Sequence, residues 1–353
     1  MLFERTNVRV VRFDLGRSVG GSGVSVVDVL IAEVVDSDGV TGLGFSYVIG
    51  GGAASALTAA KEQADRFICG QTPLPPQAHW RKIFGSFNRT GLGPNLIGLA
   101  AIDVALWDHH AKRRNVSLAV AMGGEPRAVE VYGSGGFTAT QSPKEAADSA
   151  ADQMARGFRT IKPRVKGAES DAALLTAVRQ CVGSDIQIAV DANEKCDLPA
   201  ARRLLSLARD HGVLFVEEPL PATAFEAYRV LAKMPVAIAA GEHLQQRADF
   251  VSLMRCGALS VIQPDLAMAG GLSPILELAT IAGGLDVTMS PHFLPGLFVH
   301  VAAAAPAIRL LEEFPLLEPI FEGWPERNPQ SSTMRPSDVA GHGLVLSSRY
   351  VTV

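Results

Sequence analysis

The sequence has 353 residues, a formal net charge of −4 and 48% hydrophobic residues, which is too long for one small domain and fits a barrel with a second unit. No run of Lys or Arg marks a nucleic-acid or anionic-membrane surface, and no segment is long and apolar enough to span a bilayer. The four cysteines lack metal-ligand spacing and predict reduced thiols. We expect a cytoplasmic protein whose partner is a small carboxylate, without nucleic acid or membrane.

The N-terminal third of the chain predicts an α+β domain. Residues 3–48 form three strand-like segments, and the turn sequence DSDG at 36–39 is a hairpin signal between the second and the third. Helices are expected over residues 53–68 and, after a proline-rich break, through the segment LIGLAAIDVALWDHHAKRR. We assign this domain to residues 1–125.

From Val129 onward, short apolar strands alternate with helical segments at intervals of roughly 25 residues, a pattern typical of parallel βα units that close into a barrel. We assign the barrel to residues 126–320, with a last strand that ends in LLEP at Glu318. Residues 321–353 are polar and rich in proline and glycine. This tail is expected to return to the N-terminal domain.

Three acidic residues each follow an apolar run in consecutive predicted strands: Asp191 in IQIAVDAN, Glu217 in VLFVEEP and Glu242 in PVAIAAGEH. A single acidic residue at a strand end is more often a solvated loop residue or a helix cap, but three in register favour a shared ligand. They should project at the C-terminal ends of the strands, where barrel enzymes carry their active sites. Because converging carboxylates repel one another, the sequence predicts a divalent cation, and oxygen ligands favour Mg²⁺ over Zn²⁺.

Other charged residues belong to the same predicted mouth of the barrel. Lys162 and Arg164 share one face of the second strand. Asp265 and His292 end neighbouring strands, so that Asp265 can hold one ring nitrogen and leave the other as a base. Glu318 is a candidate acid at the end of the last strand. Together these groups suit removal of a proton alpha to a carboxylate, with the metal and cations stabilising an enediolate.

The motifs VDAN, VEEP, AGEH, QPD, SPH and LLEP, in this order and spacing, resemble the mandelate racemase branch of the enolase superfamily, within the mandelate racemase/muconate lactonizing enzyme family. The resemblance implies a modified TIM barrel, (β/α)7β, with an α+β capping domain formed by the N-terminal third and the C-terminal tail. Cap loops around residues 19–25 and 45–52 would close over the substrate. It also implies a homo-oligomer, and Mg²⁺ bound by the three acidic residues named above.

The resemblance further implies roles for individual residues. Asp265 and His292 would form a base dyad, Glu318 would be the electrophile, and Asn193 would face the substrate. The family's second strand usually carries Lys-x-Lys, whereas this chain has Arg164 at the second position. Arginine stays protonated and is a poor base, so this departure weakens a two-base racemisation.

We therefore expect a Mg²⁺-dependent lyase that dehydrates a sugar acid to a 2-keto-3-deoxy acid. In the elimination that such family members resemble, the histidine takes the alpha proton and its imidazolium then helps the beta hydroxyl leave. The alternative is a racemase, epimerase or cycloisomerase of a 2-hydroxyacid or sugar acid, with Lys162 on the second face. A third hypothesis, a barrel that binds a carboxylate without turnover, would require missing catalytic groups.

Two further expectations concern the surroundings of the site. His243 directly follows Glu242, and strand alternation predicts that its side chain points to the opposite face. The glycine-rich segments 20–23 and 50–52 lack phosphate-loop spacing and are expected to be lid segments. The first of them favours a roomy or polar pocket.

Overall fold

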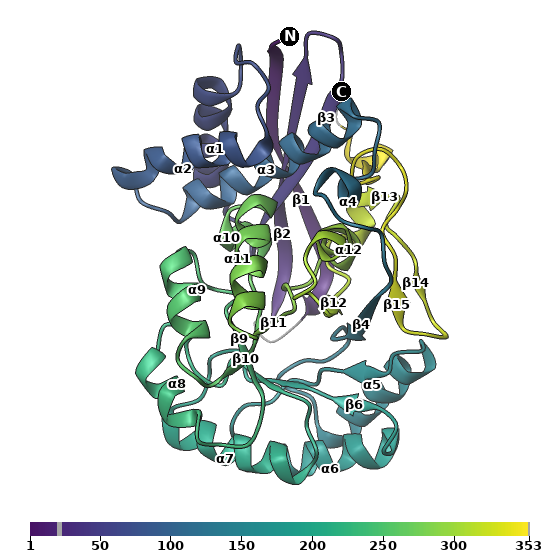
Figure 1. Ribbon diagram of the computed structural model, residues 1–353. Coiled ribbons are helices and arrows are strands. Elements are labelled where there is room, and N and C mark those ends of the chain that lie inside the picture. The colour runs from purple at the N-terminus through teal and green to yellow at the C-terminus, as the bar shows by residue number, and fades with distance from the viewer. Residues whose placement is uncertain (20–22, 352–353) are drawn as a thin grey trace.

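A computed structural model describes residues 1–19 and 23–351 (Figure 1). The N-terminal unit contains an antiparallel sheet of order β1-β2-β3, made of β1 (Phe3–Val19), β2 (Val24–Asp36) and β3 (Thr41–Ile49). The expected hairpin turn joins β2 to β3: the Asp36 carboxylate accepts hydrogen bonds from the backbone N–H groups of Asp38 and Val40, both at 3.0 Å. Gly39 has φ +82°, a conformation that favours glycine in such a turn.

Helices follow this sheet in the chain, and the first and the longest of them pack against it. The helices are α1 (Ala54–Phe67), α2 (Pro76–Phe84), η1 (Gly85–Asn88), α3 (Pro94–Arg113) and α4 (Leu118–Ala121). Helix α3 lies directly on β3, where Gly42 and Gly44 allow the close approach. A Cβ atom at Gly42 would lie 2.1 Å from the carbonyl oxygen of Ala105, and one at Gly44 would lie 2.2 Å from that of Ala101. No described helix has the length and apolar composition to cross a membrane.

The second unit is a barrel of parallel strands (Figure 1). Its strands are β4 (Val129–Gly133), β5 (Thr160–Ile161), β6 (Gln187–Ile188), β7 (Val190–Asp191), β8 (Val216–Glu217), β9 (Ile238–Ala240), β10 (Leu259–Ile262), β11 (Thr288–Met289) and β12 (Leu310–Glu313). β6 and β7 form one interrupted strand, because the Ala189 N–H between them bonds the Ile161 carbonyl while Val190 bonds Phe215 on the other side. A bridge from Met289 to Ile308 and the pairing of β12 with β4 complete the circle.

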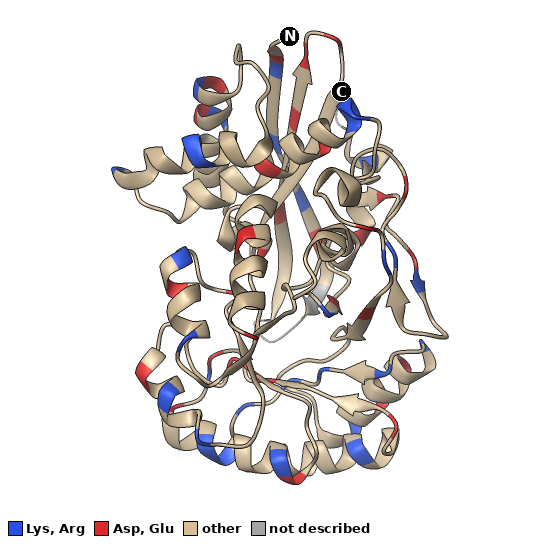
Figure 2. Cartoon of the chain, viewed as in Figure 1, with Lys and Arg blue, Asp and Glu red and all other residues tan. Residues whose placement is uncertain are grey.

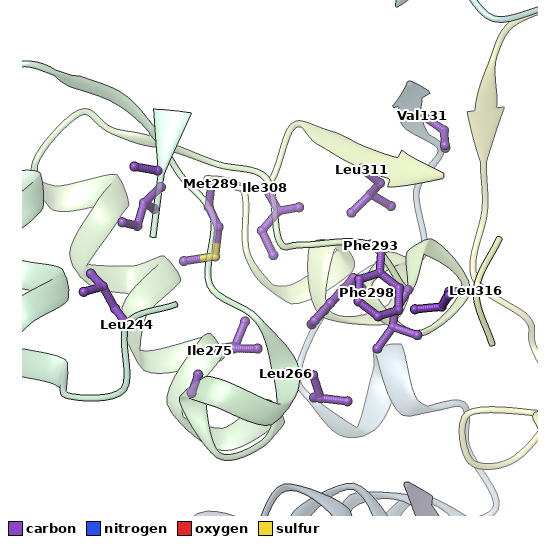
Figure 3. Close-up of a cluster of buried hydrophobic side chains, with 14 of the residues drawn as sticks. Val131, Leu244, Leu266, Ile275, Met289, Phe293, Phe298, Ile308, Leu311 and Leu316 are labelled. Atoms are coloured by element: carbon purple, nitrogen blue, oxygen red, sulfur yellow. The ribbon is translucent and has the colours of Figure 1, made fainter. Parts of the chain in front are cut away.

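A helix follows every strand position except the last. These helices are α5 (Pro143–Ala155), α6 (Asp171–Val182), α7 (Leu198–Asp210), α8 (Phe225–Leu231), α9 (Arg247–Met254), α11 (Leu272–Gly284), which the short α10 (Leu266–Ala269) precedes, and α12 (Pro295–Ala304). The predicted (β/α)7β barrel with an α+β capping unit is thereby confirmed. Met289 of β11 and Leu311 of β12 join Phe298 of α12 and Ile308 in one buried cluster (Figure 3).

Large side chains fill the barrel interior at the end that lies away from the capping unit. Tyr132 and Phe215 are buried there, with their ring centroids 6.1 Å apart, and they pack with Ala189, between β6 and β7, and Ala239 of β9. The Lys162 ammonium lies 5.3 Å from the Tyr132 ring centroid, a cation–π distance. Access to the interior is therefore from the end that faces the capping unit, where the strands have their carboxyl ends.

The C-terminal tail contacts both units. It contains η2 (Glu318–Ile320), β13 (Phe321–Glu322), β14 (Arg327–Asn328), β15 (Thr333–Met334), β16 (Val345–Leu346) and η3 (Ser348–Tyr350). β15 pairs antiparallel with β4 of the barrel. On the capping side, the His342 N–H donates to Asp108 and its ring bonds the Leu43 carbonyl at 2.8 Å. The domain boundaries at residues 125 and 320 stay predictions.

The expected end of the last strand is corrected by the structure. β12 ends at Glu313, and Glu318 begins the 3-10 helix η2 instead. Two similar runs, LLEEF and LLEP, lie close together in the chain, and Pro315 separates them. Only the first pairs with β4, whereas Pro319 directly after Glu318 lacks the N–H that a ladder needs.

Candidate active site

A cavity of about 500 Å³ lies between the capping unit and the carboxyl ends of the barrel strands. Five of the predicted site residues line it: Arg164, Asn193, Glu242, Asp265 and His292. Charged residues of both signs lie at the inner ends of the strands as well as on the outer helices (Figure 2). The fold thus brings together residues that are more than a hundred positions apart in the sequence.

Lys162 forms the centre of a buried charge cluster below the cavity. Its side chain is 0% exposed, and its Nζ lies 2.5 Å from Glu217 Oε1, 2.8 Å from Glu312 Oε1 and 3.9 Å from Asp191 Oδ2. Burial by itself lowers the pKa of the ammonium, but Glu217 and Glu312 outweigh burial and raise the pKa above its ordinary value. Lys162 is therefore held as a cation.

The predicted metal ligands occupy adjoining strand ends. Asp191 on β7 and Glu217 on β8 are register partners, and Glu242 lies in the turn after β9. Arg164 donates to the Asp191 carboxylate, which also accepts from the Asn193 N–H at 2.7 Å. All three carboxylates have cations or hydrogen-bond donors against them, as a concentration of negative charge requires.

A different trio of residues comes closest together. Among the described residues, the His and carboxylate groups whose ligand atoms all lie within 4.8 Å are Glu194, Glu218 and His243. His243 Nδ1 is 3.5 Å from Glu194 Oε2 and 3.4 Å from Glu218 Oε1, and the ring lines the cavity. Glu194 and Glu218 raise the pKa of His243 to about 11, so the imidazolium balances both carboxylates.

The expectation that His243 faces away from the site is wrong. Strand β9 ends at Ala240, and Gly241 adopts φ +125°, which breaks the two-residue alternation. Both Glu242 and His243 therefore reach the cavity.

Asp265 and His292 form the predicted hydrogen-bonded pair. His292 Nδ1 lies 2.8 Å from Asp265 Oδ2, while Nε2 lies 3.5 Å from Glu242 Oε2. Asp265 is itself fixed, because its Oδ1 caps α10 by accepting from the N–H groups of Ala267 and Met268. Burial lowers the pKa of His292, but Glu242 and Asp265 outweigh it and raise the pKa to about 9.

Tyr47 is a site residue that the sequence motifs did not indicate. It lies on β3 of the capping unit, is 3% exposed, and donates a hydrogen bond to Asp265 Oδ2, the oxygen that His292 also contacts. Its ring centroid is 5.0 Å from that of Phe293. No local sequence signal marks this tyrosine, because its partner is 218 positions away.

Glu312 is the second missed residue. It lies on β12, is buried, and its carboxylate accepts from Ser134 Oγ at 2.5 Å and from the Phe293 N–H at 3.2 Å, besides contacting Lys162. Glu318 lies apart from this cluster, with one carboxylate oxygen buried and unbonded, and burial raises its pKa to about 7. The run LLEE carried the signal for Glu312, since it is an acidic pair at the end of an apolar strand.

The capping side of the cavity differs from the barrel side. Its lining includes Val19, Val24, Val48, Ile49 and Ile97, with Phe314 and Leu316 of the barrel beside them. The expectation was a roomy or polar pocket, and this wall of the cavity is apolar. Residues 20–22, from which that expectation came, lie outside the described residues.

A barrel of this order, capped by an α+β unit and carrying acidic and basic side chains at its carboxyl strand ends, defines an enolase-like class of barrel protein. The match to family models is specific. Residues 17–123 match the mandelate racemase/muconate lactonizing enzyme N-terminal domain, and residues 145–350 match the enolase C-terminal domain-like model. The chain belongs to the mandelate racemase/muconate lactonizing enzyme family, as its motifs predicted.

Relatives of known activity cover most of the chain. The L-talarate/galactarate dehydratase of Salmonella typhimurium is 32% identical over 330 residues, which span 92% of this chain and 81% of the relative. The D-galactarolactone cycloisomerase of Agrobacterium fabrum is 30% identical over 327 residues, spanning 90% and 85%. The solved L-talarate dehydratase from Polaromonas sp. JS666, complexed with Mg and L-glucarate, has a TM-score of 0.90 and 31% identity and covers 99% of this chain and 96% of its own.

Proposed function

We propose that the protein is a Mg²⁺-dependent dehydratase that converts a sugar acid to a 2-keto-3-deoxy acid. The observation that carries this proposal is that the site has a general base on one side only. The dyad of Asp265 and His292 faces the cavity, while the opposite strand carries the cations Lys162 and Arg164. Elimination of water needs one base that can also act as an acid. The dehydratases among the relatives support the same reaction class.

The residues present fit a bound Mg²⁺. Asp191, Glu217 and Glu242 would hold it, since they offer only carboxylate oxygens at three adjoining strand ends. The contacts of these carboxylates with Lys162, Arg164 and His292 support a site that attracts positive charge. When bound, the ion supplies positive charge against the enediolate oxygens of the substrate.

The chain's own residues then account for the elimination. His292 Nε2 is placed to take the proton alpha to the substrate carboxylate, because Asp265 fixes Nδ1 and leaves Nε2 toward the cavity. The resulting imidazolium returns that proton to the beta hydroxyl, the Cβ–O bond breaks, and water leaves. The enol that remains becomes the 2-keto-3-deoxy acid, and Arg164 orients the carboxylate.

Lys162 and Glu312 support this arrangement from below. With two carboxylates within 2.8 Å, Lys162 remains an ammonium and adds fixed positive charge to the floor. Glu312 on β12 takes the place that the sequence gave to Glu318, at the carboxyl end of the last strand. We place Asn193, which lines the cavity beside Asp191, against the substrate hydroxyls.

A second candidate is an isomerase of the same family, favoured by the likeness to D-galactarolactone cycloisomerase over 90% of the chain. It would also use His292 as its base. A racemase is less well supported, because neither Lys162 nor Arg164 is free to take a proton on the other face. A barrel without turnover is disfavoured by the intact dyad.

The test is a screen of the purified protein with Mg²⁺ against a library of sugar acids. Release of keto acid is followed with semicarbazide, and exchange of the alpha proton is followed by NMR in D₂O. Keto acid formation supports the dehydratase. Exchange without keto acid moves the function to the isomerase, and the absence of both signals with every acid contradicts proton abstraction altogether.

A further inference from the structure

The two sides of the cavity select for different parts of one ligand. On the capping side, Val19 and Val24 are cross-strand partners at the tip of β1 and β2, and Ile49 ends β3. Phe314 and Leu316, which follow β12, extend the same apolar surface from the barrel. These side chains offer no hydrogen bonds, so they favour contact with carbon rather than with hydroxyl or carboxylate groups.

On the polar side of the cavity, the positively charged side chains are already paired with carboxylates of the protein. Among the described lining residues, Arg164 is the one Lys or Arg side chain, and it pairs with Asp191. The histidines of this side are paired as well: carboxylates of Glu194, Glu218 and Glu242 lie 3.5, 3.4 and 3.7 Å from the nitrogens of His243, and Asp265 lies 2.8 Å from His292 Nδ1. Both ring nitrogens of His243 therefore already face protein carboxylates, and neither is open to a second ligand carboxylate.

From these two observations, we infer that the substrate is a monocarboxylic hydroxy acid whose far end is apolar carbon. Its carboxylate lies beside Arg164, its neighbouring hydroxyls lie near Asn193 and Glu194, and its far end lies against the valine and isoleucine wall. This inference rests on the proposed function and narrows it. It separates the protein from the relatives named for talarate and galactarate, because those acids carry a carboxylate at each end.

The size of the expected selectivity follows from the two surfaces. Burial of one methyl or methylene group against the wall is expected to raise kcat/KM roughly fourfold. A second carboxylate in the same place would lose its hydration without gaining a partner, which is expected to lower kcat/KM on the order of 100-fold.

The experiment compares matched acids with the full-length protein and Mg²⁺. In each of the galacto, gluco and manno series, the aldarate, the aldonate and the 6-deoxyaldonate are assayed for alpha-proton exchange in D₂O and for keto acid. The expected order of kcat/KM is 6-deoxyaldonate, then aldonate, then aldarate. An aldarate that equals or exceeds its aldonate overturns the inference but leaves the dehydratase standing, whereas no exchange with any acid overturns the proposed function itself.

A charge placed in the wall tests the same inference from the protein side. Val24→Lys is expected to raise the aldarate to aldonate ratio of kcat/KM at least tenfold, because it supplies the missing partner for a second carboxylate. Val345→Lys is the matched control, since Val345 lies in the tail and is 59% exposed. Val24→Thr, which keeps the shape of the side chain and adds a hydroxyl, should lower turnover of the 6-deoxyaldonate alone. Unchanged ratios in both Val24 variants overturn the inference.

Discussion

The barrel side of the cavity and its capping side differ in how they are held together. On the barrel side, buried ion pairs such as Lys162 with Glu217 connect one strand end to the next. On the capping side, the wall is apolar, and polar contact with the barrel concentrates on the segment after Asp265: Tyr47 bonds Asp265, Trp80 bonds the Gly270 carbonyl, and Asp103 bonds Ser273. The chemistry therefore belongs to the barrel, while the capping unit shapes the substrate end and steadies the base.

The largest effect should come from removing the base on the barrel side. His292→Asn keeps a hydrogen-bond donor toward Asp265 but cannot take a proton, so kcat is expected to fall roughly 10³-fold. The measurement is alpha-proton exchange together with keto acid release. His211→Asn, a histidine on the far side of the barrel that contacts Thr176, is the control and should retain activity. Full turnover by His292→Asn would exclude the dyad as the base.

Metal binding distinguishes the two groups of acidic residues on the barrel side. Mg²⁺ at about 100 times its Kd should stabilise the folded protein by about 2.7 kcal/mol, seen as a rise in the thermal unfolding midpoint, and EDTA should abolish both this rise and turnover. Glu217→Gln is expected to remove the response, whereas the neighbouring Glu218→Gln should retain it. The opposite pattern would assign the ion to the group formed by Glu194, Glu218 and His243.

A smaller effect is expected where the capping unit touches the dyad. Tyr47→Phe removes only the hydroxyl that bonds Asp265, and kcat is expected to fall about tenfold with little change in KM. Because proton transfer would become slower, the primary isotope effect of an alpha-deuterated substrate should increase. Tyr228→Phe is the matched control, because Tyr228 is also buried and the variant loses a hydrogen bond to the Leu220 carbonyl, away from the dyad. Identical isotope effects in both variants would show that Tyr47 is merely structural.

The last effect concerns stability against acid, rather than turnover, where the barrel meets the tail. His300 on α12 is fully buried, and burial lowers its pKa to about 3. Since this pKa lies below the unfolded value of about 6.5, the unfolded state binds the proton first, and stability is lost as pH falls from about 6.5 toward 3. Between pH 7 and pH 5, His300 should contribute a fall of about 2 kcal/mol to the free energy of unfolding, and this contribution should be absent in His300→Gln. Denaturant titrations of both proteins at pH 7 and pH 5 give the change in the free energy of unfolding with pH. An equal change in the original protein and in His300→Gln would contradict the prediction.

The sequence predicted the site best where a charged residue directly follows an apolar, buried strand. Asp191, Glu217 and Glu242 could be placed at one rim because a carboxylate after an apolar strand has few other positions. Sequence pattern could not choose between Glu312 and Glu318, because both follow Leu-Leu and only strand pairing with β4 separates them. Tyr47 could not be found at all, since the contact between a capping strand and the barrel depends on how two units pack.

The pairing of β4 has a consequence for how the chain is made. This first barrel strand pairs with β5, with β12 at residues 310–313 and with β15 at residues 333–334. During synthesis, β4 therefore leaves the ribosome long before two of its three partners exist. The strand must wait with apolar residues such as Val129 and Val131 uncovered, and the barrel can close only when nearly the whole chain has been released.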